Sequence, residues 1–402
     1  MEFELPDDLV ESGKTKIVLV VMDGLGGLPD PESGRTELET AATPNLDRLA
    51  RVSALGLTEP VGPGITPGSG PGHLALFGYD PVRWNIGRGV LSALGVGFEL
   101  RVGDVATRLN FATVDAEGKI TDRRAGRPSD EENRRLVAKL RAGVRPPEGV
   151  EIFFESEKEH RLVLVLRGEG LAADLSDTDP QQTGVPPLPV GALTPAAGES
   201  ARVVQGVLDQ ANAVLSDEPR ANAVLARGFA AYEAYPSFTE RYKLRALAIA
   251  RYPMYRGVAR LVGMDVAPVA ETDEGNIAIL AEHFDAYDFF FVHFKYADSR
   301  GEDGDFAAKV KAIEAVDRLI PGIEALKPDV LIVGGDHSTP AAYRAHSWHP
   351  VPVLIRSKWT RGVEVAGFGE RYCRQGELGI FPARHLMTLA LAHAGRLAKF
   401  GA

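Results

Sequence analysis

Three aspartates in this chain stand where functional groups collect in α/β proteins. Asp23 ends the apolar run KIVLVVMD, Asp298 lies shortly after FFFVHF, and Asp336 ends DVLIVGGD. A single acid after a strand is usually a helix cap or a turn former. Three such acids are a stronger signal, because ligands of open α/β sheets gather at the carboxyl ends of the strands. We therefore expect these carboxylates to lie together at one edge of a sheet.

Histidines accompany the acids. His337 follows Asp336 directly, and His346 lies nine residues further on. Carboxylate oxygens and imidazole nitrogens are ligands for Mg, Mn and Zn, so the group predicts a metal site. His293 lies inside an apolar strand, where a core histidine is the better interpretation. His73 precedes a helix-like apolar run, and a packing role and a role in the site are equal alternatives there.

The heptapeptide PGSGPGH places Ser69 among glycines and prolines, four residues before His73. Such segments are usually plain connecting loops. A metal would change that interpretation, because coordination activates a hydroxyl that is otherwise a poor nucleophile near neutral pH. Ser69 is therefore a candidate nucleophile.

Basic residues gather in the middle of the chain. The segment DRRAGR packs three guanidinium groups into six residues, and a His-Arg pair begins a later strand. Arginine forks bind phosphate and carboxylate in bidentate fashion, although a charged loop is usually only solvated. A metal site in the same chain favours a phosphorylated acid as the ligand. The candidates for substrate binding are Arg88, Arg123, Arg124, Arg127, His160 and Arg161, and Lys243 is a candidate for catalysis.

The elements that position these residues alternate between strands and helices. Strand patterns cover 16–23, 289–294, 329–336 and 350–355, and helical patterns follow Thr43-Pro44 and cover 307–320 and 382–397. This order predicts an α/β layered sandwich with a central, mostly parallel sheet. Residues 103–190 have short alternating runs between charged and proline-rich segments, which predicts an inserted, smaller α+β domain. The catalytic domain would comprise 1–102 and 191–402.

The composition bounds the class of protein. Of 402 residues, 45% are hydrophobic and 25% are charged, as in soluble globular proteins. A formal net charge of -10 argues against a nucleic-acid or anionic-membrane partner. The single cysteine, Cys373, excludes an internal disulfide. The acidic N-terminal segment does not resemble a signal peptide, and no stretch approaches the roughly 18 apolar residues of a membrane helix. We expect a cytoplasmic protein.

Nine segments, in the same order, resemble the archaeal-type cofactor-independent phosphoglycerate mutases of the alkaline phosphatase superfamily. They are VVMDGLGGLP (20–29), TPNLDRLA (43–50), HLALFGYDP (73–81), GRGVLSALGVG (87–97), NFAT (110–113), ITDRRAGR (120–127), GVARLVGMDV (257–266), GGDHSTP (334–340) and HSWHPVPVLI (346–355). The ordered set is specific and spans most of the chain. The resemblance implies an alkaline-phosphatase-like fold and a glycolytic isomerase that interconverts 3-phosphoglycerate and 2-phosphoglycerate without 2,3-bisphosphoglycerate.

The resemblance also implies two divalent metal ions and a transiently phosphorylated serine. The family's ligands for one metal fall on Asp23, Ser69, Asp336 and His337, and two ligands for the other fall on Asp298 and His346. Mn or Mg is expected, with Co or Zn as the alternatives. 3-Phosphoglycerate would transfer its phosphoryl group to Ser69 and the glycerate 2-hydroxyl would take it back. The inserted domain would act as a lid that excludes water, and His73 or His160 would exchange protons with the glycerate hydroxyls.

Two positions depart from the family's pattern. Where the family has DxxGH, this chain has Asp298-Ser299-Arg300-Gly301-Glu302, so Glu302 takes the place of a histidine ligand. His349 is a weaker substitute. A carboxylate makes the site harder and disfavours zinc. The residues between Ser69 and His73 are Gly-Pro-Gly, where the family has Asp-Thr-Ala.

Three other functions stay open from the sequence. A metal-dependent phosphatase or another phosphomutase would keep the acids, Ser69 and His337 without needing DRRAGR. A homoserine kinase-like phosphotransferase would need ATP, and the chain has no GxxxxGK[ST] phosphate loop. A metal-binding regulator without turnover is the non-enzymatic alternative, and Glu302 is its main hint.

Overall fold

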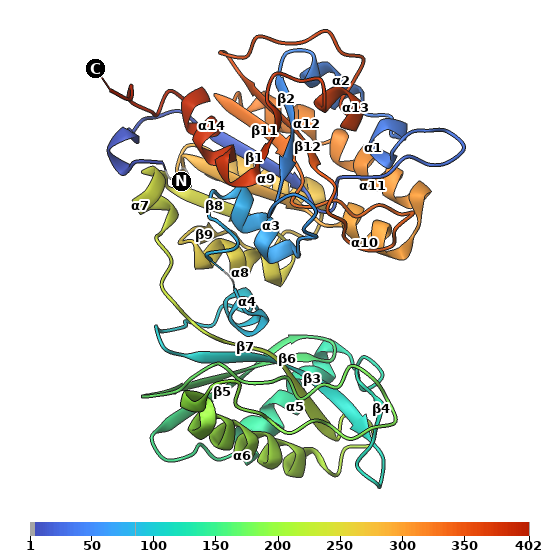
Figure 1. Ribbon diagram of the computed structural model, residues 1–402, viewed down its shortest axis with the longest axis vertical. Helices are drawn as coiled ribbons and strands as arrows, with labels where there is room; N and C mark the ends of the chain where they lie inside the picture. Colours follow the sequence, from blue (N-terminus) through green and yellow to red (C-terminus); the bar gives the residue numbers. More distant parts are fainter. Residues whose placement is uncertain (1–4, 85, 402) are drawn as a thin grey trace. The chain divides into compact units, whose positions relative to one another are not determined.

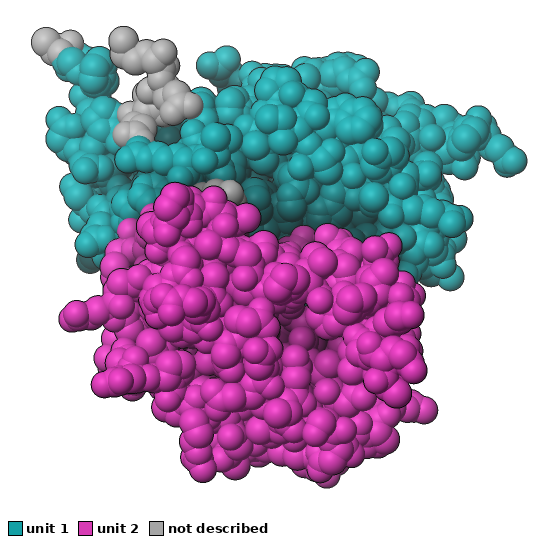
Figure 2. Space-filling view, turned by 60° about the horizontal axis from the view of Figure 1, so that its bottom comes forward, with its two compact units in different colours: residues 1–85, 236–402 teal, residues 86–235 magenta. Residues whose placement is uncertain are grey.

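The computed structural model describes residues 5–84 and 86–401. The chain divides into two compact units, unit 1 (Met1–Asn85 and Pro236–Ala402) and unit 2 (Ile86–Tyr235), which are coloured separately in Figure 2. Each unit has its own sheet and its own hydrophobic core. In the described part of the chain, no helix combines the length and the apolar character needed to cross a bilayer.

The elements of unit 1 are as follows. The strands are β1 (Ile17–Met22), β2 (Ala54–Glu59), β8 (Ala246–Ile249), β9 (Asp265–Val266), β10 (Phe289–Phe294), β11 (Val330–Gly334), β12 (Val351–Ser357) and β13 (Gly379–Pro382). The helices are α1 (Glu37–Thr40), α2 (Pro44–Ala50), α3 (Ser69–Leu76), α7 (Phe238–Tyr242), α8 (Pro253–Leu261), α9 (Asp273–His283), α10 (Tyr296–Asp303), α11 (Phe306–Asp317), α12 (Ile320–Ala325), α13 (Glu370–Cys373) and α14 (Leu386–His393), with 3-10 turns at Asp7–Leu9 and Ala383–His385.

One eight-stranded sheet runs through unit 1 in the order β13-β2-β12-β11-β1-β10-β8-β9 (Figure 1). Only β12 is antiparallel to its neighbours among these pairings. Val18 and Val20 of β1 join a core with apolar residues of α2, α9, α11 and α12. Phe291 of β10 contacts Phe77, the residue after α3, with ring centroids 4.9 Å apart. Helices therefore cover both faces, which confirms the predicted α/β class.

The predicted elements of unit 1 differ from the observed ones mainly at their ends. The strand predicted at 289–294 is β10 with the same bounds. The helix predicted at 382–397 is a 3-10 turn followed by α14, which ends at His393. Gly395 has a φ of +65°, a conformation that glycine adopts readily after a helix end.

Unit 2 is an antiparallel sheet with helices. Its elements are α4 (Arg88–Gly95), β3 (Val105–Val114), β4 (Ile120–Asp122), α5 (Asp130–Gly143), β5 (Val150–Lys158), β6 (Arg161–Gly168), a 3-10 turn at Pro195–Ala197, α6 (Gly198–Leu215) and β7 (Ala223–Ala231). β3 pairs with β4, β6 and β7, and β6 also pairs with β5. Leu109 and Leu164 of the sheet form a core with Leu140 of α5 and Val207 of α6.

Unit 2 contains the predicted insertion, 103–190, and extends beyond it at both ends. β7 aligns along β3 from Val105 to Ala112, and α6 packs on the same sheet. The amphipathic pattern of α6 does not indicate which domain its apolar face packs against. The prediction therefore placed this segment in the catalytic domain, whereas the structure places it in unit 2. The role of this domain as a lid stays a prediction.

Candidate metal centre

Ser69 is the first residue of α3, so PGSGPGH begins a helix and is not only a connecting turn. Pro71 is compatible with the first turn of a helix, where backbone N–H groups have no helical partner. Gly72 is needed for packing, because a Cβ there would lie 2.5 Å from the carbonyl oxygen of Asp336. The close packing of Gly72 against Asp336 brings the start of α3 next to His337, and Ser69 Oγ lies 3.1 Å from His337 Nε2.

Asp23, Asp336 and His337 meet beyond the carboxyl ends of β1 and β11. His337 Nε2 lies 3.3 Å from Asp23 Oδ1 and 3.2 Å from Asp336 Oδ2, and all three side chains are fully buried. Within the described residues, both carboxylate oxygens of Asp23 and Oδ2 of Asp336 accept no well-formed hydrogen bond. Buried carboxylates are costly without a compensating partner, and a divalent cation is such a partner. The donors therefore fit a metal ion.

A second group of candidate ligands contains Asp298, His337 and His346. His346 Nε2 lies 3.4 Å from Asp298 Oδ1 and 3.8 Å from Glu302 Oε1. Asp298 and Glu302 are one helical turn apart on α10, which places them on the same face. The Nδ1 of His346 lies 2.9 Å from the carbonyl of Pro67, so Nδ1 donates there and Nε2 is left for the acids. These oxygen and nitrogen donors also fit a divalent cation.

Burial and neighbouring charges shift the pKa values of Asp298, His346 and Glu302. Burial raises the pKa of Asp298, but the hydrogen bond from His346 and nearby cations lower it to about 2. Burial lowers the pKa of His346, and the Asp298 carboxylate reverses this and raises it to about 9. Burial and the nearby Asp298 charge raise the pKa of Glu302. Asp298 is therefore ionised near neutral pH, and its carboxylate can stabilise a neighbouring cation.

Two residues of this cluster were not expected from the sequence. Lys295 Nζ lies 3.1 Å from Asp23 Oδ2 and also forms an ion pair with Asp298. His293, interpreted as a core residue, is buried and stacks on Tyr255, but its Nε2 also lies 3.3 Å from Asp23 Oδ2. Burial would raise the pKa of Asp23, and the opposing charge of Lys295 helps to hold it well below its usual value. The spacing of His293 and Lys295, two residues apart at a strand end, was the available signal.

His73 is both packed and in contact with a candidate ligand. Its Nδ1 lies 2.8 Å from the carbonyl oxygen of Ser69 and 3.1 Å from Asp336 Oδ2. A carbonyl oxygen can only accept, so Nδ1 carries a proton that it donates to Ser69, and this N–H lies beside the Asp336 carboxylate as an ion-pair partner. Burial lowers the pKa of His73, but the Asp336 carboxylate more than compensates and raises it above its usual value. His73 is therefore packed inside unit 1 and also lies next to a candidate metal ligand, so the packing role and the role in the site are not exclusive.

Lys243 and His349 lie apart from these groups. Lys243 caps α7 in the left-handed conformation, and its Nζ donates to the Val10 carbonyl at 2.5 Å. The His349 ring stacks on Trp348, and its Nδ1 lies 3.1 Å from Ser347 Oγ. Neither residue is among the candidate ligand groups of the described chain.

The candidate substrate-binding residues of unit 2 fall into two sets. Burial lowers the pKa of His160 to about 4, and the charges of Arg161, Arg124 and Arg127 add to the effect, so these arginines lie near enough to His160 to act on its charge. Arg123 differs, because its fork makes two hydrogen bonds to Asp179, at 2.8 and 2.7 Å. An arginine held in this way is less able to bind a ligand.

Further polar residues of unit 2 share the sheet face opposite α5 and α6. Leu109 and Phe111 of β3 face the core under those helices, so Arg108 and Asn110 point to the other face. Arg108 pairs in register with Arg227. In the described chain, the Nε atoms of both arginines and Oδ1 of Asn110 are buried without a hydrogen-bond partner. Strand alternation in VATRLNFATV was the available signal for Arg108 and Asn110, which were not predicted as site residues.

Arg88 lies at the start of α4 in the same unit. A Cβ at Gly228 would lie 2.8 Å from the Cβ of Arg88, so the two residues are in close contact. The charge of Arg88 also acts on Arg108, whose pKa is lowered first by burial and then by neighbouring arginines. Arg88 therefore belongs near this polar face.

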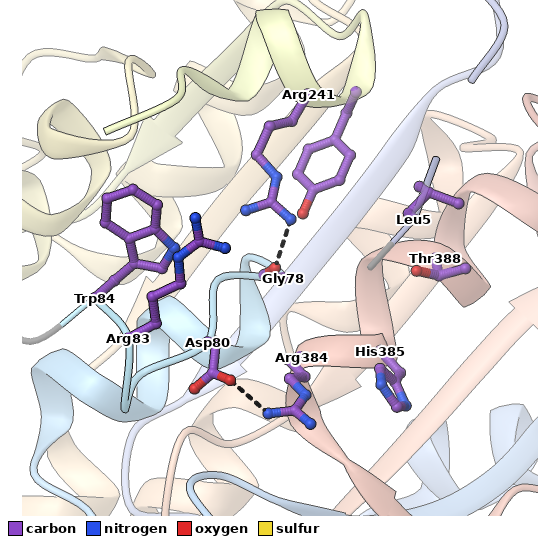
Figure 3. Close-up of a pocket in the computed structure, with 10 residues that line it drawn as sticks. Leu5, Gly78, Asp80, Arg83, Trp84, Arg241, Arg384, His385 and Thr388 are labelled. Atoms are coloured by element: carbon purple, nitrogen blue, oxygen red, sulfur yellow. Dashed lines mark hydrogen bonds and ion pairs between the residues drawn. The ribbon is translucent and has the colours of Figure 1, made fainter. Parts of the chain in front are cut away.

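A separate cavity of about 40 Å³ in unit 1 contains none of the candidate residues. Figure 3 shows two hydrogen bonds in it, from Arg241 to the Gly78 carbonyl at 3.1 Å and from Arg384 to Asp80 at 2.7 Å. Arg241 also lies over the ring of Tyr79. These contacts account for the two guanidinium groups as structural residues.

Comparisons with known proteins show the family of this chain. A family profile described as 2,3-bisphosphoglycerate-independent phosphoglycerate mutase matches residues 50–221. A Thermus thermophilus protein named "Probable 2,3-bisphosphoglycerate-independent phosphoglycerate mutase" is 54% identical over 100% of this chain and 99% of its own. The protein of the same name from Thermotoga maritima is 52% identical over 99% of both chains.

Two solved structures are similar over nearly the whole chain. The PH0037 protein from Pyrococcus horikoshii has 31% identity and a TM-score of 0.83, over 97% of this chain and 100% of that one. The cofactor-independent phosphoglycerate mutase from Thermoplasma acidophilum has 30% identity and a TM-score of 0.73, over 95% and 100%. The chain therefore belongs to the archaeal-type family of 2,3-bisphosphoglycerate-independent phosphoglycerate mutases, isomerases with an alkaline-phosphatase-like fold.

Proposed function

We propose that this protein interconverts 3-phosphoglycerate and 2-phosphoglycerate through a phosphoserine at Ser69, in a centre that holds two divalent cations. One observation carries the proposal: Ser69 Oγ lies 3.1 Å from His337 Nε2, inside a buried group of aspartates and histidines. A lone serine in a plain turn would have no such surroundings. Family membership supports the reaction, and the cluster supports the chemistry.

The proposed reaction has two half-reactions. In the first, Ser69 Oγ forms a bond to phosphorus and the bond from phosphorus to O3 of glycerate breaks. The proton lost by the serine replaces the phosphoryl group on O3. In the second, O2 of glycerate attacks the phosphoserine, Ser69 Oγ leaves, and the proton from O2 returns to it. Neither water nor a second phosphoryl donor is consumed.

The proposed metal ligands are all residues of unit 1. They are Asp23, Ser69, Asp336 and His337 for one cation and Asp298, Glu302 and His346 for the other. When bound, the cations would neutralise phosphoryl oxygens and lower the pKa of the Ser69 hydroxyl. Mn or Mg is the expected metal, because Glu302 stands where the family pattern has a histidine. The Lys295 ammonium contacts Asp23 and Asp298, and we assign it a share of the charge balance.

Substrate anions are assigned to the polar face of unit 2. By strand alternation Arg108, Arg161 and Asn110 lie on this face, and so does Arg227, whose Nη1 lies 3.6 Å from Asp179 Oδ2. His160 lies close enough to Arg161 and Arg108 to be affected by their charges. Arginine forks suit both carboxylate and phosphate. We assign a weaker, longer-range electrostatic role in anion binding to the remaining predicted residues, Arg88, Arg124 and Arg127. Arg123 is instead assigned a structural role, because it forms an ion pair with Asp179.

Proton exchange with the glycerate hydroxyls is assigned to His160. Burial and neighbouring arginines lower the pKa of His160 to about 4, so its imidazole is neutral near pH 7. A base with this pKa is weak and would hold a proton from a glycerate hydroxyl only transiently. His73 is less suited, because its Nδ1 is engaged by Ser69 and Asp336. We assign His73 to orienting Asp336.

A coupled assay with 3-phosphoglycerate and Mn²⁺, without added 2,3-bisphosphoglycerate, tests the proposal. We expect 2-phosphoglycerate from the wild type and a loss of at least about 10⁴-fold in Ser69→Ala, because removal of a catalytic nucleophile typically costs that much. The matched control is Ser53→Ala, a buried serine whose Oγ donates to the Leu49 carbonyl. Absence of 2-phosphoglycerate, or free phosphate as the main product, would contradict a mutase.

A further inference from the structure

Thr339 links the two groups of candidate metal ligands through one hydroxyl. The side chain is fully buried and lies two residues after His337. Its Oγ1 is 2.7 Å from Asp298 Oδ1 and 2.9 Å from His337 Nδ1. Asp298 belongs to the second group only, whereas His337 belongs to both groups. A single hydroxyl therefore contacts a member of each.

Proton counting gives these two hydrogen bonds a direction. A hydroxyl has one proton to donate, and an ionised carboxylate can only accept. The Thr339 O–H therefore donates to Asp298, and its oxygen accepts from the Nδ1–H of His337. A neutral imidazole has one N–H, so Nε2 of His337 carries a lone pair.

That lone pair points at the other candidate ligands. His337 Nε2 is the atom that lies within 3.3 Å of Ser69 Oγ, Asp23 Oδ1 and Asp336 Oδ2. Lone pairs that converge in a buried space repel one another unless a cation lies among them. The hydrogen bond at Nδ1 thus keeps the ring in the one tautomer that can bind a metal at Nε2.

The backbone of Thr339 is held on both sides. Its N–H donates to the Gly26 carbonyl at 3.0 Å, and its carbonyl accepts from Lys309 Nζ at 2.8 Å. Lys309 is fully buried and donates to the Gly26 carbonyl as well, at 2.9 Å. The ammonium therefore ties the segment after Asp23 to the segment after His337.

Glycines leave room for Thr339 at both metal groups. A Cβ at Gly24, directly after Asp23, would lie 2.6 Å from Thr339 Oγ1. A Cβ at Gly301, three residues after Asp298, would lie 2.1 Å from the Thr339 carbonyl oxygen. A side chain at either glycine would therefore clash with Thr339, so the backbone packs closely against this residue on both sides.

We propose that Thr339 is a positioning residue for both metal ions: its hydroxyl fixes the metal-binding tautomer of His337 and orients Asp298. Loss of this one hydroxyl therefore weakens metal binding in both groups. The proposal rests on the proposed metal centre, but not on the phosphoserine chemistry.

The test is a titration of the full-length chain, stripped of metal, with Mn²⁺ followed by calorimetry and electron paramagnetic resonance. Thr339→Val keeps the shape and removes the hydroxyl, and we expect it to weaken both Mn²⁺ sites about 10- to 100-fold. Thr339→Ser keeps the hydroxyl and should stay within about threefold of the wild type. The matched control is Thr58→Val, a buried threonine whose hydroxyl donates to the Val351 carbonyl at 3.3 Å, and it should leave Mn²⁺ binding unchanged.

Three results would overturn the proposal: wild-type affinity in Thr339→Val, weakening of only one site, or an equal loss in Thr339→Ser. Nitrogen-15 NMR of the metal-free wild type provides a test that needs no variant to fold. The proton of the His337 ring is expected on Nδ1, and a proton on Nε2 would contradict the proposal. Failure of the wild type to bind two Mn²⁺ ions would instead contradict the proposed metal centre.

Discussion

Glu302 is the residue at which the candidate centre departs most from the family pattern. Its Oε1 lies 3.8 Å from His346 Nε2, and its side chain is 55% exposed. Burial and the Asp298 charge raise the pKa of Glu302, so the folded protein resists its ionisation. A cation beside it would relieve this cost, and a hard cation would do so best.

Glu302→His should move metal preference towards zinc and cobalt, because an imidazole nitrogen is a softer ligand than a carboxylate. We expect the ratio of Zn to Mn bound from an equimolar mixture to rise by about tenfold, measured by elemental mass spectrometry. The control is Glu282→His at an exposed position of α9, which should keep the wild-type ratio. An unchanged ratio in Glu302→His would mean that Glu302 is not a ligand.

The clustering of the candidate ligands was more predictable from the sequence than the surroundings of the other candidate residues. Asp23, Asp336 and His337 were predictable because parallel strands bring their carboxyl ends to one edge. Lys295 was not singled out, since a lysine after a strand usually faces solvent. Arg123 was grouped with its neighbours in DRRAGR, but its partner Asp179 is 56 residues away and no local pattern predicts that pairing.

At the scale of elements, Glu370 connects α13 with the segment that follows β1. Its two carboxylate oxygens accept from the Gly27 N–H at 2.9 Å and from the Thr36 hydroxyl at 2.6 Å. Burial nevertheless raises the pKa of Glu370 to about 7. Thr36 is also the N-cap of α1, so one carboxyl group joins three parts of unit 1.

The stability of the wild type should therefore carry a pH dependence that Glu370→Gln lacks. Because the folded pKa is about 7 and the ordinary value is 4.5, the folded state binds more protons between these pH values. The stabilisation that the protonated Glu370 side chain contributes to the folded state is fully present below pH 4.5. It is lost as the pH rises through about 7. Between pH 4.5 and 8 we expect the wild type to lose up to about 3 kcal/mol relative to Glu370→Gln.

Urea denaturation of both proteins at the two pH values measures this difference. Parallel stability changes in the wild type and in Glu370→Gln would contradict the raised pKa. Subtracting one protein from the other removes the contributions of all other titrating groups, which the two chains share.

Elements with a strong local pattern were predictable, and those that depend on distant packing were not. β10 was predicted with its observed bounds from a continuous apolar run. The start of α3 was not, because Gly70, Pro71 and Gly72 are weak helix formers by propensity. Gly72 is accommodated there because α3 packs closely against the chain at Asp336, a contact between distant segments that the sequence does not reveal.

At the scale of the whole molecule, the proposed metal ligands and the proposed substrate arginines lie on different units. Every proposed ligand is in unit 1, and Arg108, Arg161 and Arg227 are in unit 2. Tyr79 donates to the Pro236 carbonyl at 2.6 Å, so the chain segments on either side of the insertion come close together within unit 1. The predicted insertion, 103–190, did not include α4, α6 and β7, which belong to unit 2. β7 and α6 belong to this unit because they pack on its sheet and core, and such packing between distant segments has no local sequence pattern.

Replacing residues 86–235 with a short glycine-serine linker should separate metal binding from catalysis. We expect the shortened protein to bind Mn²⁺ within about threefold of the wild type, because no proposed ligand is removed. Mutase activity should fall by at least about 10³-fold, because the arginines proposed to bind the substrate anions are lost. Calorimetry and the coupled assay measure the two properties, and loss of Mn²⁺ binding in a shortened protein that folds would contradict the assignment of the ligands.

The most direct measurement of the central claim is the location of the phosphoryl group during turnover. The wild type is mixed with 3-phosphoglycerate and Mn²⁺, quenched with acid within one turnover, digested and mapped by mass spectrometry. We predict phosphate on the peptide that contains Ser69, and none in the Ser69→Ala control. Phosphate on a different residue, or full mutase activity in Ser69→Ala, would contradict the account.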